Sequence, residues 1–130
     1  MLKSYLAVMV VGALGCAARM WLSNSLGEKY GNTFPVGTLV VNIAGCFVIG
    51  LFAGLTRPEG GWIVPPIVRQ AVMIGFLGGF TTFSSFSLQT LTLIDDGQWG
   101  FVALNIALSV VLCMVAVWLG QMIALQVTRA

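Results

Sequence analysis

Glycines, hydroxyl side chains and phenylalanines are concentrated in one short stretch of an otherwise apolar segment. The stretch runs from Gly75 to Ser87 and reads GFLGGFTTFSSFS. In membrane hydrocarbon every backbone polar group needs an internal partner, so such a cluster is tolerated only where it is buried in protein or faces a polar pathway. We therefore expect a break in a membrane helix at this stretch.

The stretch also carries side chains that could serve an anion. Phe83 and Phe86 are spaced i and i+3, so they share one face of a helix. The positive edges of aromatic rings, with hydroxyl and amide donors beside them, can replace the water around a dehydrating anion. Packing of the two rings between helices is the competing interpretation.

Polar side chains also recur at four-residue spacing in two other apolar segments, which places each row on one face of a helix. Each row could line a path or supply hydrogen bonds between helices, as Ser, Thr and Asn commonly do in membranes. Asn42 favours a path, because its amide has four hydrogen-bonding positions to satisfy. The two rows are Thr38, Asn42 and Cys46, and Asn105, Ser109 and Cys113.

Ionisable side chains are scarce where a coupled transporter would need them. A proton-coupled transporter usually has a carboxylate or histidine within the membrane, whereas this sequence has no histidine and its four carboxylates fall in predicted connections. A small multidrug-type, proton-coupled exporter is therefore the weaker alternative. Catalytic constellations and metal-ligand spacings are missing as well, so we do not expect an enzyme.

The composition predicts the elements that position these residues. Of 130 residues, 58% are hydrophobic and 8% charged, whereas roughly 25% are charged in soluble domains. A membrane span needs about 20 apolar residues, and four segments qualify: 4–24, 36–56, 68–94 and 99–126. We expect one transmembrane domain over residues 1–130, an all-α integral membrane protein with four helices and the third broken near its middle.

Basic residues near the span ends bear on orientation. With four spans both termini lie on one side, which carries four basic residues against two opposite, Arg19 and Lys29. This bias favours cytoplasmic termini but is small enough for a chain that inserts both ways. Arg19 could draw anions into a vestibule or reach for the headgroups.

Four short helices can scarcely enclose a polar path, so a homodimer is expected. Two small-x-x-x-small patterns, Gly50 to Gly54 and Gly75 to Gly79, offer faces for close helix approach. Such patterns are frequent in membrane helices and carry little weight alone.

The central stretch closely resembles the signature of a known family. Residues 78–86, Gly-Gly-Phe-Thr-Thr-Phe-Ser-Ser-Phe, are similar to the GGxTTFSTF motif of the Fluc (CrcB) fluoride channels. Residues 35–42 and 12–19 resemble the family's motifs in its second and first helices, and the length and number of spans agree from end to end. Departures occur at Gln89, where relatives often carry glutamate, and along the fourth span, where only Ser109 keeps its hydroxyl.

The resemblance implies an antiparallel, dual-topology homodimer with two pores in a bacterial cytoplasmic membrane. Each pore would export fluoride passively and give fluoride resistance. A structural sodium ion at the dimer axis would be held by the backbone carbonyls of Gly78 and Thr81, and Arg19 would lie in the vestibule. The implied fluoride pore residues are Asn42, Phe83, Phe86, Thr38, Ser84, Asn105 and Ser109.

Overall fold

The computed structural model describes residues 1–129, which form an all-helical chain. Its helices are α1 (Leu2–Tyr30), α2 (Val36–Leu55), α3 (Pro66–Gln70), the π-helix η1 (Ala71–Leu77), α4 (Gly78–Phe80), α5 (Phe83–Asp95) and α6 (Trp99–Arg129). Four helical stretches are long and apolar enough to cross a membrane: Leu2–Tyr30, Val36–Leu55, Pro66–Asp95 and Trp99–Arg129. The expected multi-pass, all-α membrane protein is confirmed.

The first helix is longer than its apolar segment. The predicted span ended at residue 24, whereas α1 continues to Tyr30 and ends at Gly31, whose φ is 82°. Hydropathy marks where the hydrocarbon ends, but the backbone hydrogen bonds of a helix can continue into the headgroup region. The residues from Gly27 to Tyr30, predicted as a connection, are therefore helical.

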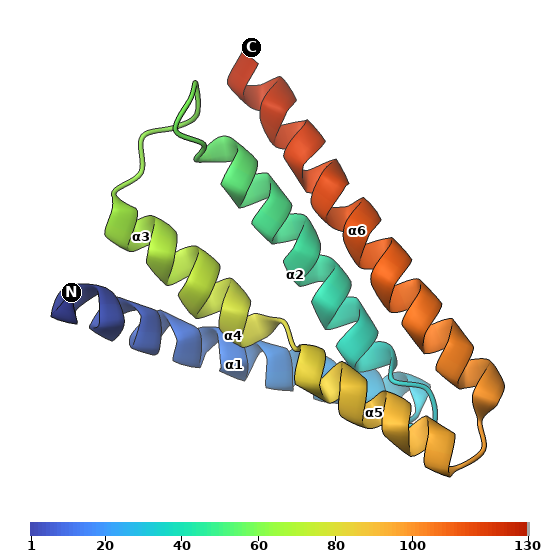
Figure 1. The fold of residues 1–130 in the computed structure, drawn as a ribbon. Coiled ribbons are helices and arrows are strands. Elements are labelled where there is room, and N and C mark those ends of the chain that lie inside the picture. The colour runs from blue at the N-terminus through green and yellow to red at the C-terminus, as the bar shows by residue number, and fades with distance from the viewer. Residues whose placement is uncertain (130) are drawn as a thin grey trace.

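The helices form two parallel pairs. α1 packs against η1 and α4, and α2 packs against α6. In Figure 1 the two pairs diverge toward the end that carries both termini, and they converge near the α1–α2 and α5–α6 connections. The second half of the third span, α5, lies where the pairs converge.

Glycine allows the closest contacts within each pair. A Cβ atom added at Gly50 would overlap the Val117 carbonyl of α6, and one added at Gly79 would lie 2.6 Å from the Gly12 carbonyl of α1. Both small-x-x-x-small patterns thus serve contacts within one chain. The prediction that they allow close helix approach is confirmed, and the helices that approach belong to the same chain.

The predicted break in the third span is confirmed. α4 ends at Phe80 and α5 begins at Phe83, and the two threonines between them have extended backbone, with ψ of 155° at Thr81 and 114° at Thr82. The π-helical turns of η1 just before the break were not predicted. Such turns are rare and often accompany functional sites.

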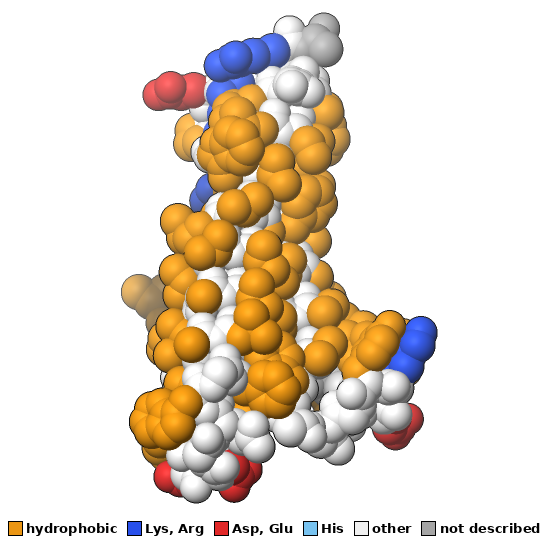
Figure 2. Space-filling model, turned by 90° about the vertical axis from the view of Figure 1, so that its right-hand side faces the viewer, with side chains coloured by type: hydrophobic (Ala, Val, Ile, Leu, Met, Phe, Trp, Pro, Cys, Tyr) orange, Lys and Arg blue, Asp and Glu red, His pale blue; other side chains and the backbone are white. Residues whose placement is uncertain are grey.

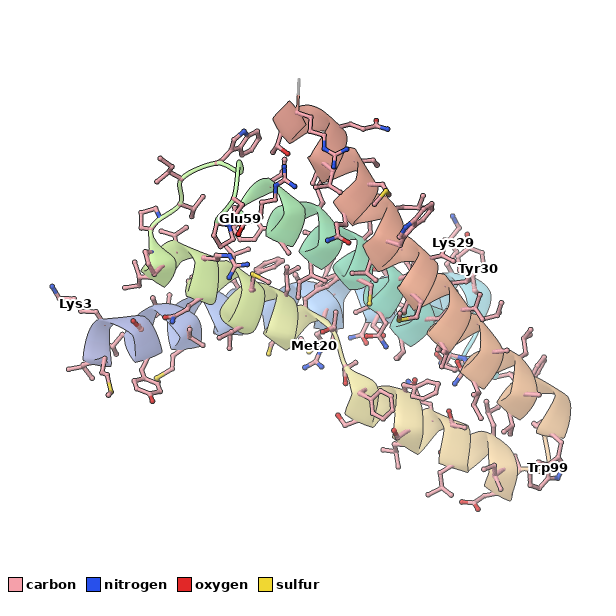
Figure 3. The ribbon with its side chains drawn as sticks, turned by 45° about the horizontal axis from the view of Figure 1, so that its top comes forward. Lys3, Met20, Lys29, Tyr30, Glu59 and Trp99 are labelled. Atoms are coloured by element: carbon pink, nitrogen blue, oxygen red, sulfur yellow. The ribbon has the colours of Figure 1, made fainter. Side chains whose placement is uncertain are left out.

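The surface has the pattern of a membrane protein. Apolar side chains cover most of the face seen in Figure 2, and charged side chains gather toward its ends. Figure 3 places Lys3 at one end of the molecule and Lys29, Tyr30 and Trp99 at the other. Exposed tyrosine and tryptophan are typical of the level where the bilayer meets water.

Candidate functional site

The side chain of Asn42 from α2 stabilises the break by bonding to its backbone. Its Nδ2 donates to the Thr82 carbonyl oxygen at 2.9 Å, and its Oδ1 accepts from the Thr82 N–H at 2.7 Å. Thr82 is buried, with 8% of its surface exposed, so its two backbone groups need partners within the protein. Asn42 supplies both, which stabilises the extended conformation.

Several backbone carbonyls lose their helical donors at the same place, among them those of Gly78 and Thr81. In a continuous helix the N–H of Thr82 would donate to Gly78 and that of Ser85 to Thr81. Here the Thr82 N–H donates to Asn42, and the Ser85 N–H donates to the Thr82 hydroxyl at 3.1 Å. The carbonyl oxygens of Gly78 and Thr81 are therefore available to another ligand.

These freed oxygens have the chemistry that a hard cation prefers, since unwound backbone in membrane helices commonly coordinates such ions. No cluster of three or more His, Cys, Asp or Glu side chains that could hold a metal occurs in residues 1–129. A cation at the break would therefore rely on backbone oxygens. Gly78 is exposed. A Cβ atom added to Gly78 would have the Met73 carbonyl oxygen as its nearest neighbour, at 3.8 Å, so there is open space beside this glycine.

Thr82 is the N-cap of α5 and was missing from the predicted site. Its hydroxyl accepts from the Ser85 N–H and lies 3.3 Å from the Ser84 hydroxyl and 3.1 Å from that of Ser85. Threonine directly before a helix is a preferred N-cap. That preference could have identified Thr82 once α5 was expected to begin at Phe83.

A cavity of about 400 Å³ lies beside the break, between α2, α5 and α6. It brings together four of the predicted pore residues, Asn42, Phe83, Phe86 and Ser109. The two ring centroids are 5.3 Å apart and the rings are tilted by 50°. We call this space the central cavity; its walls combine an amide, a hydroxyl and aromatic rings.

A second cavity of about 380 Å³ contains Arg19. It shares Thr82 with the central cavity and also includes Thr38 and Gln89. We call it the Arg19 cavity. Its other polar residues are Ser23, Asn24 and Ser85, so hydrogen-bonding side chains surround the single positive charge.

A third space continues from the Arg19 cavity to the end of the molecule. This end cavity, of about 460 Å³, shares Ser23, Thr38 and Gln89 with the Arg19 cavity and includes the 31–35 connection and Asp96. The three cavities therefore follow one another from the α1–α2 and α5–α6 connections to the break. Their shared walls are polar, which is unusual within membrane helices.

Two predicted pore residues lie outside these cavities. Asn105 has 1% of its surface exposed; its Nδ2 donates to the Thr90 hydroxyl at 3.0 Å, and its Oδ1 accepts from the Ser109 hydroxyl at 3.5 Å. It joins α5 to α6 and lines none of the three cavities. Ser84 is exposed and is likewise missing from their walls.

Cys46 and Cys113 complete the central cavity on the α2 and α6 sides. Both thiols are free and half-buried. They belong to the two polar rows of the sequence, and the structure places them at the border of a cavity. Two members of each polar row therefore line the same cavity: Asn42 and Cys46 from α2, and Ser109 and Cys113 from α6.

Comparison with known proteins identifies the family. Residues 6–121 match the family model described as "CrcB-like protein, Camphor Resistance (CrcB)". Two proteins named "Fluoride-specific ion channel FluC" are similar to this chain over nearly their whole length. The one from Opitutus terrae is 57% identical over 120 residues, covering 92% of this chain and 91% of that protein. The one from Rhodospirillum rubrum is 52% identical over 126 residues, covering 97% and 98%. This chain therefore belongs to the CrcB family.

Proposed function

We propose that this protein is a fluoride-selective ion channel that releases cytoplasmic fluoride through the inner membrane of a bacterium by passive electrodiffusion. The observation that carries the proposal is the central cavity, where Asn42, Phe83, Phe86 and Ser109 meet beside a helix break. Membership of a family whose similar members are named fluoride channels agrees with it. Fluoride that enters a cell as the neutral acid is trapped there as the anion, so a passive path suffices to export it.

The chain of cavities suggests how an anion would be transferred from water. Arg19 would raise the local anion concentration near the entrance, and the Thr38 hydroxyl, which lines the same cavity, would donate to the ion. Asn42 gives one Nδ2 hydrogen to the Thr82 carbonyl, and its second amide hydrogen remains for the anion. The ring edges of Phe83 and Phe86 and the Ser109 hydroxyl would then replace the remaining water.

We further propose that the working protein is an antiparallel, dual-topology homodimer. Phe83 lies in the middle of the third span, lines the central cavity and still has 77% of its surface exposed. A second copy crossing at the break would cover this ring and close the cavity. The weak bias of basic residues between the two ends allows such a pair to insert in opposite orientations.

A sodium ion at the dimer axis is the cofactor we propose. One chain offers the two freed carbonyls of Gly78 and Thr81, and two oxygens cannot surround a cation. A second copy related by a two-fold axis would bring the same two groups. When bound, the ion would interact favourably with the carbonyl dipoles and link the helix breaks of the two copies.

Fluoride efflux from liposomes that contain only the purified protein tests the proposed function. We expect rapid fluoride release after addition of a potassium ionophore, and no release from matched chloride-loaded vesicles. Folded protein that releases neither ion would refute the channel assignment. Drug uptake driven by a proton gradient would instead support the small multidrug-type exporter, for which the spans offer no carboxylate at mid-membrane depth.

A further inference from the structure

A separate cavity lies at the opposite end of the molecule from the proposed entrance. It has a volume of about 600 Å³ and is formed by the α2–α3 connection and the beginning of the third span. Two arginines, Arg57 and Arg69, line it together with apolar side chains that include Trp62, Ile63 and Ile74. It shares no lining residue with the three cavities described above.

Each of the two guanidinium groups has more N–H donors than its hydrogen bond to the protein uses. Arg57 donates to the Thr128 hydroxyl and Arg69 to the Thr56 hydroxyl, both at 3.3 Å. Each guanidinium has five N–H donors, and these bonds to neutral oxygens leave both charges uncompensated.

Negative charge from the protein does not fill this role. The lining of the cavity contains no aspartate or glutamate. Glu59 belongs to the same connection, but it is exposed and lies outside the lining. An anionic ligand with several oxygens would satisfy the two arginines, because guanidinium groups match the geometry of phosphate.

The apolar wall indicates what kind of phosphate fits. Trp62 has 57% of its surface exposed and Ile63 is fully exposed, beside cationic groups at the end of two membrane spans. Arginine and tryptophan at this level typically reach the lipid headgroups while their apolar parts face the acyl chains. A phosphate that carries hydrocarbon would contact both surfaces, whereas a free ion would leave the apolar wall in water.

We propose that this cavity binds the headgroup of an anionic phospholipid, with its phosphate between Arg57 and Arg69 and its glycerol and acyl chains against Trp62, Ile63 and Ile74. Basic pockets between membrane helices are suited to such headgroups. A zwitterionic lipid would fit less well, because the lining offers no carboxylate to its ammonium group. The proposal does not depend on which ion the protein conducts.

Native mass spectrometry of the purified full-length protein tests the proposal. The protein is mixed with phosphatidylglycerol or with phosphatidylcholine of the same acyl chains, and the retained lipid is counted. We expect wild type to retain phosphatidylglycerol in preference. R69Q should lower this preference about fivefold, the effect expected of one basic side chain near an anionic surface, and R57Q/R69Q should lower it further.

R129Q is the matched control, because it removes one arginine charge at the same end but outside the lining. It should change the preference less than R69Q does. Equal retention of the two lipids by wild type, or equal effects of R69Q and R129Q, would overturn the proposal. Should R57Q/R69Q fail to fold, the comparison of R69Q with R129Q still decides the question.

Inorganic phosphate distinguishes the two sources of the anion. Added at millimolar concentration, it should leave the bound phosphatidylglycerol in place, because it cannot use the apolar wall. Displacement of the lipid by inorganic phosphate would identify a site for a free anion and refute the lipid assignment.

Discussion

Asn42 and Thr82 are 40 residues apart in the sequence and exchange two hydrogen bonds, of 2.9 and 2.7 Å, across the break in the third span. An asparagine side chain thus replaces the two backbone partners that a continuous helix would provide. The same residue borders the central cavity. One amide therefore connects the shape of the break to the chemistry of the proposed path.

Asn42→Ala should damage both stability and conduction. It leaves the N–H and the carbonyl of Thr82 without partners in a buried position, at a cost of about 1–3 kcal/mol for each group. We expect a lower free energy of unfolding in detergent titrations and a fluoride flux reduced about tenfold or more, since each 1.4 kcal/mol added to a barrier is about tenfold in rate. Wild-type flux in this variant would remove Asn42 from the proposed path.

Replacing the aromatic rings should affect flux much more than folding. Phe83 is 77% exposed in the single chain, so Phe83→Leu removes few intrachain contacts, but it removes the ring edge that the proposed path requires. We expect Phe83→Leu and Phe86→Leu to lose most fluoride efflux. Phe101→Leu is the control. The Phe101 ring packs against Phe34, with 5.5 Å between the ring centroids, and Phe101 lines none of the described cavities. Unchanged flux in both pore variants would refute their assignment.

The bond between Asn105 and Thr90 should contribute to stability. Such side-chain hydrogen bonds between membrane helices average about 0.6 kcal/mol. We expect Asn105→Ala and Thr90→Val each to lower the free energy of unfolding, and the double variant to lose less than the sum, because the bond can be removed only once. Fluoride efflux from the same variants tests the separate prediction that Asn105 serves the pore. Additive losses of stability would show that the two side chains do not act as a pair.

Glycine at position 50 should be essential for the contact between α2 and α6. Alanine in place of glycine favours a helix by about 1 kcal/mol, but at Gly50 the added Cβ would overlap the Val117 backbone, and overpacking costs about 1–3 kcal/mol. We therefore expect Gly50→Ala to destabilise the protein. Gly100→Ala is the control, since no atom lies within 4 Å of its added Cβ, and it should be neutral or stabilising.

Sodium should stabilise the folded protein if it binds the carbonyls of Gly78 and Thr81. A ligand that binds only the folded state raises stability by about 2.7 kcal/mol at 100 times its dissociation constant. We expect the thermal midpoint to rise with sodium concentration more than with potassium at equal ionic strength. Identical curves in the two salts would contradict a specific sodium site.

The sequence by itself determined the membrane class, the four spans and the position of the break. These features follow from local physics: apolar length sets a span, and the run of glycines and hydroxyls from Gly75 to Ser87 cannot continue as a plain helix in hydrocarbon. The family motif also named Asn42, Phe83 and Phe86, which the structure places around one cavity.

Only the tertiary structure decided which partners the polar side chains find. Asn42 and Asn105 look equivalent in their rows. Asn42 bonds to the backbone at the break and borders a cavity, whereas Asn105 is buried and bonds to Thr90. The glycine patterns likewise were assigned to contacts within the chain only once the helices were packed. Periodicity places a side chain on a helix face, but the face it meets depends on how distant segments pack, and spacing along one helix carries no information about that.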